Sequence, residues 1–194
     1  YSRGEQFFRC RISKDRKQFE PKEIGAPPKG KSADGRANAR GIVTLYLGDT
    51  EKTAIHETRT GLYDHVCIGT FELKSPITVI DFKKINEISP FLDGIIDDIA
   101  ELAINKKHLK QIDYEMGRVM RKSDDVLDYL PTQYIADFVR SIVSEEYPEQ
   151  YAFQGIEFRS VMNPEGFNLA IFTPECFDVI DIKMKRINQI SYVW

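Results

Sequence analysis

The stretch Gly25–Arg59, GAPPKGKSADGRANARGIVTLYLGDTEKTAIHETR, combines the signals of a loop, a strand and a helix. It begins as a loop rich in proline, glycine and lysine and continues into Val43–Leu47 (VTLYL), which is typical of a short buried strand. Its last part predicts a helix, because Asp49 or Thr50 can cap the first N–H groups and Gly61 provides a stop. The stretch therefore predicts a loop, a strand and a helix in succession.

Strands are predicted on both sides of this stretch. The first, Gln6–Ile12 (QFFRCRI), is rich in residues that favour β-structure. Two more, Tyr63–Lys74 and Ile77–Phe82, are separated by Ser75 and Pro76. The end of the chain is again strand-like, over Gly155–Arg159, Phe167–Phe172 and pieces of Cys176–Trp194.

The middle of the chain is predicted to be helical. From Pro90 to about Met120, apolar residues recur three and four positions apart, as in FLDGIIDDIAELAI. A second helix begins near Pro131, which suits a first helical position, and runs through QYIADFVRSIVSEE. The order of strands, helices and strands predicts a single α+β domain over residues 1–194, with a mixed β core and flanking helices, rather than a doubly wound sheet.

The composition excludes several classes of function. The 194 residues carry a net charge of -3, so no overall field attracts nucleic acid or acidic lipid. There is no signal-like N-terminus and no apolar run of about 20 residues, so we expect no membrane segment and a cytoplasmic location. Glycine motifs for dinucleotides or phosphates and a nucleophile elbow are also missing from the sequence.

Metal chemistry is not expected either. The cysteines and histidines lack the spacing of metal ligands. Four acidic residues of the helix predicted from Pro90 to about Met120 are typical of a solvated face. No metal and no cofactor are therefore expected. The residues concerned are Cys10, Cys67, Cys176, His56, His65, His108, Asp93, Asp97, Asp98 and Glu101.

A local positive charge marks the loop from Ser13 to Gly41. Between Lys14 and Arg40 it has eight Lys or Arg and four Asp or Glu, a balance of +4 in an acidic chain. A loop of that length is uncommon in a compact domain unless it has a function. This loop is therefore the first candidate for a functional site.

Arginine, tyrosine and glutamate residues surround the loop. Arg9 lies on the first predicted strand, Arg36 and Asn38 lie in the loop as part of GRAN, and Tyr46 lies on the next strand. Glu57 shares a helix face with two small residues and is expected to point toward a half-buried pocket. Each residue also has a purely structural explanation. Arg9 can be a surface residue, Arg36 and Asn38 can shape a turn, Tyr46 can belong to the core, and Glu57 can be a solvated helix residue.

Taken together, four pieces of the chain resemble a known family. They are FFRCRI, the stretch quoted first, DYLPTQYIADFV and GIEFRSVMNPEGFNLAIF, in this order from about residue 6 to residue 172. The combination is similar to the RES domain, which is named for an arginine, a glutamate and a serine and occurs in bacterial toxin–antitoxin pairs. Residues 173–194 extend past the resemblance, as a C-terminal strand extension.

The resemblance implies an ADP-ribosyltransferase-like fold and an enzyme that breaks the nicotinamide–ribose bond of NAD+. The family's arginine, tyrosine, glutamate and serine fall on Arg36, Tyr46, Glu57 and Ser160, with an early strand arginine at Arg9. Ser141 and Ser144 lie in the same half of the chain and remain alternatives for the serine. NAD+ is then a substrate rather than a cofactor, and a protein antitoxin is the expected partner.

The implied roles suit the residue types. Glu57 would stabilise the oxocarbenium-like transition state, and Ser160 would bind the nicotinamide amide or a ribose hydroxyl. Arg36 and Arg9 would bind the pyrophosphate, because a planar guanidinium forms two parallel hydrogen bonds to it. Tyr46 would stack on the nicotinamide or the ribose.

Two other functions remain open. An ADP-ribosyltransferase would use the same residues and pass the ribose to a protein or nucleic acid. The arginine-modifying version is disfavoured, because Ile55 stands two residues before Glu57, where a second glutamate would be needed. The third possibility is a binding module that keeps a nucleotide pocket without catalysis.

Overall fold

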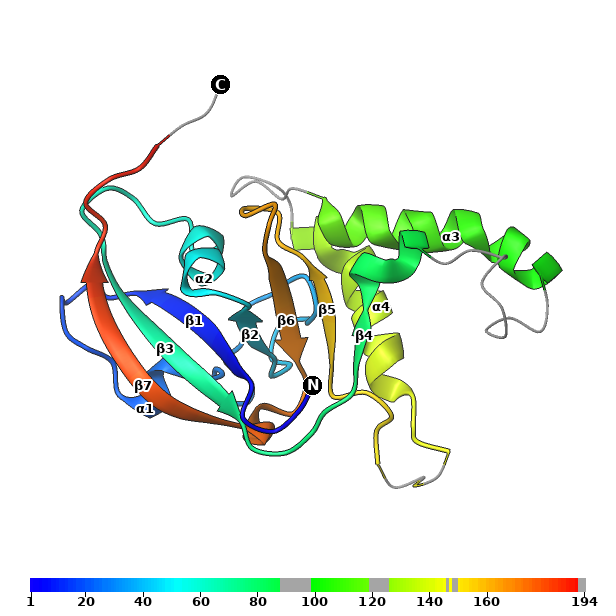
Figure 1. The fold of residues 1–194 in the computed structure, drawn as a ribbon, viewed down its shortest axis with the longest axis horizontal. Coiled ribbons are helices and arrows are strands. Elements are labelled where there is room, and N and C mark those ends of the chain that lie inside the picture. Colours follow the sequence, from blue (N-terminus) through cyan, green and yellow to red (C-terminus); the bar gives the residue numbers. More distant parts are fainter. Residues whose placement is uncertain (88–98, 119–125, 146, 148–149, 192–194) are drawn as a thin grey trace.

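The structure, a computed structural model, describes residues 1–87, 99–118, 126–145, 147 and 150–191. In this part of the chain one mixed sheet has the strand order β4-β5-β6-β2-β1-β3-β7 (Figure 1). All its neighbouring strands are antiparallel except β4 and β5, which are parallel. The strands are β1 (Gln6–Ile12), β2 (Leu45–Gly48), β3 (His65–Leu73), β4 (Val79–Asp81), β5 (Gly155–Arg159), β6 (Phe167–Ile171) and β7 (Phe177–Arg186).

Three of the described α-helices lie where the sequence predicts a helix, but a short helix at Pro21–Ile24 falls inside the segment Ser13–Gly41, for which the sequence predicts only a loop. The described α-helices are α1 (Pro21–Ile24), α2 (Glu51–Glu57), α3 (Ile99–Gly117) and α4 (Leu130–Ser141). Short 3-10 turns are η1 (Phe82–Glu87), η2 (Val126–Tyr129) and η3 (Pro174–Cys176). The predicted fold class, a single α+β domain with a mixed sheet, is therefore confirmed.

The register of the strands assigns the side chains to two faces of the sheet. Phe8 of β1 pairs with Gly48 of β2, so Phe8 and Cys10 share a face with Tyr46. Phe7 and Arg9 lie on the opposite face, because successive side chains of a strand alternate. The helix α1 covers the face of Phe7, whereas α2, α3 and α4 cover the face of Tyr46.

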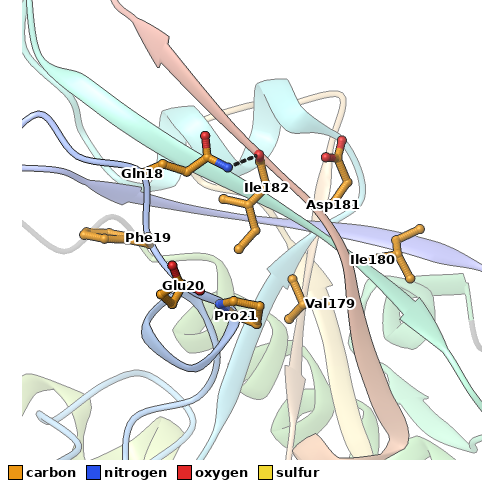
Figure 2. Close-up of a pocket in the computed structure, with 8 residues that line it drawn as sticks. All are labelled: Gln18, Phe19, Glu20, Pro21, Val179, Ile180, Asp181 and Ile182. Atoms are coloured by element: carbon orange, nitrogen blue, oxygen red, sulfur yellow. Dashed lines mark hydrogen bonds between the residues drawn. The ribbon is translucent and has the colours of Figure 1, made fainter.

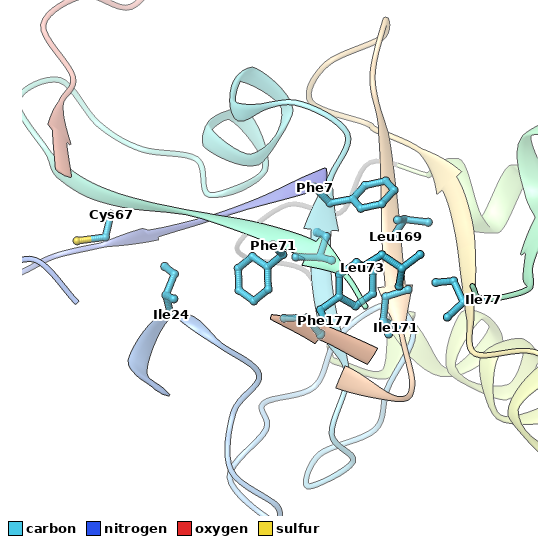
Figure 3. Packing of buried hydrophobic residues seen from close by; sticks show 11 residues of the cluster. Phe7, Ile24, Cys67, Phe71, Leu73, Ile77, Leu169, Ile171 and Phe177 are labelled. Carbon is cyan, nitrogen blue, oxygen red and sulfur yellow. The ribbon is translucent and has the colours of Figure 1, made fainter. Parts of the chain in front are cut away.

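The larger apolar core lies between α1 and the sheet (Figure 3). Ile24 of α1 is fully buried against Cys67 and Phe71 of β3. Phe7 and Phe177 meet edge to face, with ring centroids 5.9 Å apart. Full burial of such a side chain contributes about 1.5–3 kcal/mol, so this cluster fixes β1, β3 and β7 relative to one another.

The other face of the sheet carries the longer helices. Met116 of α3 and Val139 of α4 are buried against Phe158 of β5. Ala54 of α2 packs against Cys10 of β1 in a smaller cluster. The loop, the strand and the helix of the stretch Gly25–Arg59 therefore meet on this face.

The helix α2 is shorter than predicted. Thr50 is its cap, accepting a hydrogen bond from the backbone N–H of Thr53 at 3.1 Å. The helix ends at Glu57, before the predicted stop at Gly61, because Arg59 adopts a left-handed backbone conformation with φ 51°. Glu57 is therefore its last residue.

The helix α4 also ends earlier than predicted. Its last residue is Ser141, and Ile142 and Val143, which are β-branched, are not helical. Val143 instead forms an antiparallel bridge with Tyr151. The helix predicted from Pro90 to about Met120 is described only in part. Residues 90–98, which include Asp93, Asp97 and Asp98, lie outside the described residues, as does the side chain of Glu101.

Candidate active site

Glu57 lies at the C-terminal end of α2, and its carboxylate is held at one oxygen. Oε1 accepts hydrogen bonds from Ser160 Oγ at 2.6 Å and from Asn168 Nδ2 at 2.8 Å. Among the described residues no donor reaches Oε2, and the residue is exposed. One carboxylate oxygen is therefore fixed by the protein, and the other is accessible to a ligand.

The two donors belong to a buried polar network. The Ser160 hydroxyl accepts a hydrogen bond from the backbone N–H of Asn163 at 3.0 Å and donates its own proton to Glu57. Asn163 Nδ2 donates to Thr53 Oγ1 at 2.8 Å, which connects this loop to the first turn of α2. Apart from Glu57, every residue of the network is buried, and Asn168 is the most exposed of them at 7%. A fully paired network of this kind is rigid, so it fixes the position of the carboxylate.

Gly166 allows this network to close. A Cβ atom at this position would overlap Thr53 Oγ1 and lie 2.7 Å from Asn163 Nδ2 and 3.0 Å from Asp49 Oδ1. The backbone of Gly166 also accepts a hydrogen bond from Ser160 N and donates one to Asn163 O. A residue without a side chain is therefore required next to the serine.

Tyr46 and Asn38 hold the GRAN loop against β2. The Tyr46 hydroxyl donates to Asn38 Oδ1 at 2.7 Å and accepts from the Ala37 N–H at 2.9 Å. Asn38 Nδ2 donates to the carbonyls of Ala33 and Ala39. Burial raises the pKa of Tyr46, so its phenol stays neutral and keeps both hydrogen bonds.

The helix α4 supports the same loop from the other side. Gln133 Nε2 donates to the carbonyls of Gly35 at 3.1 Å and of Asn38 at 3.0 Å. Arg140 Nη2 donates to Thr44 Oγ1 at 3.1 Å. The loop that contains Arg36 is therefore ordered by β2 and α4 together.

Arg36 connects the loop to the end of α3. Its Nη1 donates to the carbonyls of Glu115 at 2.9 Å and Met116 at 2.6 Å, and its Nη2 donates to the carbonyl of Arg118 at 2.7 Å. Burial lowers the pKa of the Arg36 guanidinium, and the negative charge of Glu57 acts in the opposite direction. An arginine has five N–H donors, so the Nε–H and one Nη2–H remain for a ligand.

With NAD+ as the substrate that the family resemblance implies, we expect Arg36→Ala to raise the KM by about 10-fold or more, because hydrogen bonds to a charged group contribute about 1.5–3 kcal/mol. The matched controls are Lys29→Ala and Lys31→Ala, which remove exposed charges from the same loop and act only as screened point charges. Steady-state kinetics checks the difference. Equal losses at all three positions would mean that the loop contributes only diffuse charge.

Arg9 is not brought to Glu57. It lies on the α1 face of the sheet, and its Nη1 donates to the backbone carbonyl of Tyr46 at 3.1 Å. Burial lowers its pKa to about 10, so the side chain remains charged at neutral pH. In the structure Arg9 connects β1 to β2, which are paired only at Phe8 and Gly48 in the described residues.

Of the three candidate serines, Ser160 contacts Glu57. Ser141 Oγ instead donates to the carbonyl of Phe138, and Ser144 Oγ accepts from Tyr147 N.

Sequence reasoning missed Asn163 and Asn168. The sequence did hold a signal for Asn168, because it is the one polar residue in the strand FNLAI. A polar side chain buried in a strand needs hydrogen-bond partners.

An open cavity of about 490 Å³ lies away from these residues, beside the edge strand β7 (Figure 2). The segment from Gln18 to Pro21 forms one wall, and Val179–Ile182 forms the other. Gln18 Nε2 crosses it to donate to the Ile182 carbonyl at 2.9 Å. This cavity lies beyond β1 and β3 from β2, so it is separate from the site at Glu57.

Comparison with known proteins identifies the family. A family model described as the RES domain matches residues 7–194, and the chain therefore belongs to the RES domain family. The match extends past residue 172, where the resemblance in the motifs ended, and includes β7. A search of curated proteins found no match. Family membership is consistent with an NAD-related module of a toxin–antitoxin system.

Within the described residues no group of His, Cys, Asp or Glu is arranged to hold a metal ion. In the same part of the chain, every helix is too short or too polar to cross a lipid bilayer.

Proposed function

We propose that this protein is a toxin that cleaves the nicotinamide–ribose bond of NAD+, as a glycohydrolase or a phosphorylase. The observation that carries the proposal is the Glu57 carboxylate. It is fixed at Oε1 by Ser160 and Asn168 and is accessible at Oε2. An ADP-ribosyltransferase-like ancestry of the fold is part of the same proposal.

One carboxylate is sufficient for this reaction. Ordinary glycosidases need a general acid as well as a second carboxylate, because their leaving group is a poor one. The nicotinamide of NAD+ is already a cation and departs as a neutral molecule, so no proton has to be supplied. Glu57 Oε2 then binds the ribose hydroxyls and stabilises the positive charge that develops on the ribose in the transition state.

Arg36 is proposed to bind the pyrophosphate. Its Nε–H and remaining Nη2–H form the pair of donors that a side-on contact with two phosphate oxygens uses. Its other three hydrogen bonds keep the guanidinium in place before the substrate arrives. Such preorganisation lowers the entropic cost of binding.

Tyr46 and Asn38 are proposed to contribute to NAD+ binding in different ways, Tyr46 by contact and Asn38 by holding the loop. The half-buried ring of Tyr46 offers a surface for the cationic nicotinamide, since its hydroxyl is already paired with the loop. Asn38 acts indirectly, because both its Nδ2 and its Oδ1 hold the loop that carries Arg36. Arg9 acts through the carbonyl of Tyr46.

Expression in bacteria tests this function in the cell. We expect the active chain to arrest growth and deplete NAD+, whereas Glu57→Gln, the matched control, does neither. Cellular NAD+ is measured before growth stops, so that depletion is not a consequence of arrest. If both proteins slow growth equally with NAD+ unchanged, the harm is not catalytic and a binding module replaces the enzyme.

An inhibitory protein partner is part of the proposal. The later part of the loop from Ser13 to Gly41, residues 25–41, is held against Tyr46 and α4 and has four Lys or Arg and one Asp, so an acidic surface would be drawn to it. We expect an antitoxin to cover this loop and to block access to Glu57 in the cytoplasm. Co-expression of such a partner should restore both growth and NAD+.

A further inference from the structure

The strand β7 is an edge of the sheet, and in the described part of the chain it pairs with β3 alone (Figure 1). The Ile182 carbonyl points away from β3, because it accepts the hydrogen bond of Gln18 Nε2. The register with β3 continues without a shift from Ile182 to Arg186, and the backbone groups of successive residues alternate in direction. The N–H and C=O of Met184 therefore also point outward. Such an edge is a template for a further extended segment.

The turn from Ser13 to Lys17 is fixed close to this edge. Ser13 Oγ accepts from the Lys17 N–H at 3.0 Å and donates to the Lys17 carbonyl at 2.7 Å. The same carbonyl accepts from Cys67 Sγ of β3 at 3.5 Å, and Cys67 lies opposite Met184. The turn is therefore held against β3, one strand away from the open edge.

Uncompensated positive charge gathers at this end of the sheet. The register of β1, β3 and β7 places the side chains of Arg11 and Arg186 on the α1 face. The turn adds three cations at the same end, because the Ser13 N–H donates to the His65 carbonyl at 2.8 Å. All five cations are exposed, and within the described residues none of them forms an ion pair. We refer to them as the basic cluster: Arg11, Lys14, Arg16, Lys17 and Arg186.

The opposite face of β7 has no such excess of charge. There Lys183 and Lys185 are both paired with Glu51 of α2. Between Arg11 and Lys17 the single acid is Asp15, so the basic cluster keeps a positive balance. A potential of this kind acts over about 10 Å at 0.1 M salt, which reaches the open edge. An acidic segment is the partner of complementary charge.

The cavity of about 490 Å³ lies along the same edge, where Gln18 follows the turn and reaches across to Ile182 (Figure 2). Its walls are largely apolar, with Phe19, Pro21, Val179, Ile180 and Ile182. Two acids border it, and both are engaged elsewhere. Asp181 is paired with Lys183 Nζ at 3.1 Å, and Glu20 takes part in the capping box of α1. The cavity therefore suits an apolar side chain.

We propose that the open edge of β7 binds an extended acidic peptide of a partner protein as an added strand. The backbone of the peptide pairs with Met184, its acidic side chains face the basic cluster, and an apolar side chain enters the cavity once Gln18 turns away. Backbone bonds then provide affinity, and side-chain contacts provide specificity. The outward backbone groups favour a peptide over a nucleic acid, which would use the charges alone. Glu57 belongs to α2, which packs on the opposite face of the sheet, so this surface is separate from the proposed active site.

Binding of a synthetic peptide tests this proposal. The probe is a fluorescein-labelled peptide of about ten residues, in which threonine alternates with glutamate and the first glutamate is replaced by leucine. Fluorescence anisotropy should show saturable binding at 0.1 M salt. The affinity should fall at 1 M salt, where the screening length is only about 3 Å. The same peptide with lysine in place of glutamate is the control and should not bind.

Two variants separate the charges from the strand pairing. Arg186→Glu should weaken binding at least about 10-fold, because it places like charges against each other. Lys110→Glu, at an exposed position of α3, is its matched control and should bind as the wild type does. Met184→Pro removes one outward N–H and leaves the bonds to β3 in place, so it should weaken binding at least about 5-fold. Met184→Leu, which keeps the N–H, is the control, and the melting temperature of each variant shows that it is folded.

Several results would overturn the proposal. One is wild-type affinity in Arg186→Glu or in a folded Met184→Pro. Another is the absence of saturable binding up to about 1 mM peptide, the result expected if a second copy or another segment of the chain covers the edge. A single-stranded oligonucleotide that binds more tightly than the peptide would make the surface a nucleic-acid site instead. None of these measurements involves NAD+ cleavage, so this proposal and the proposed function fail separately.

Discussion

Glu57→Gln is expected to lower the rate of nicotinamide release by about 10²–10³-fold, the usual loss when one electrostatic stabiliser of a transition state is removed. Glutamine has the same length, and its amide oxygen can still accept hydrogen bonds from Ser160 and Asn168. What is lost is the negative charge that faces the developing positive charge on the ribose. Release of nicotinamide from purified protein measures the effect.

The melting temperature separates this effect from unfolding. Glu57 is exposed, and its replacement leaves the buried part of the network intact, so the melting temperature should be nearly unchanged. Glu51→Gln, at the other end of α2, is the matched control, because it removes a carboxylate that pairs with Lys183 and Lys185 of β7 instead of with Ser160. Wild-type turnover in Glu57→Gln would remove Glu57 from the reaction.

Gly166→Ala is expected to destabilise the protein by about 1–3 kcal/mol, as an added methyl group does in a well-packed interior. The new Cβ would overlap Thr53 Oγ1 and press on Asn163, so the loop with Ser160 must move away from α2. Because Ser160 then releases Glu57, kcat should fall by at least about 10-fold. Thermal unfolding and steady-state kinetics of the same preparation measure the two effects.

Gly61→Ala is the control for this change. It adds the same methyl group at a site where the nearest atom, Asp64 Oδ2, is 3.4 Å away. We expect little change in stability or kcat. If Gly166→Ala retained full activity and stability, the buried network would not be needed to position Glu57.

Much of the fold follows from local patterns in the sequence. The strands at Gln6–Ile12 and Gly155–Arg159 have the predicted bounds, because β-forming residues are concentrated there between turn residues. The helices α2 and α4 end several residues before the ends that the sequence predicts. A single left-handed residue, Arg59, ends α2, and the bridge between Val143 and Tyr151 replaces the end of α4. Neither feature has a local signal.

The site was predictable only in part. The stretch Gly25–Arg59 places Arg36, Tyr46 and Glu57 near one another, because its loop, strand and helix are consecutive. The pairing of Ser160 with Glu57 joins residues that are far apart in sequence, and only the resemblance to the family pointed to it. Arg9 was placed with the others, but strand alternation turns it to the opposite face of the sheet.

Product analysis of the purified protein with NAD+ labelled in its ADP-ribose part shows whether this protein cleaves the nicotinamide–ribose bond. We expect release of free nicotinamide, with all label in a small molecule, either ADP-ribose or its phosphate adduct. We also expect Glu57→Gln, prepared in parallel, to release nicotinamide at about 10²–10³-fold lower rate. Label attached to a protein or nucleic acid would instead indicate a transferase. Intact NAD+ after prolonged incubation would contradict the account altogether.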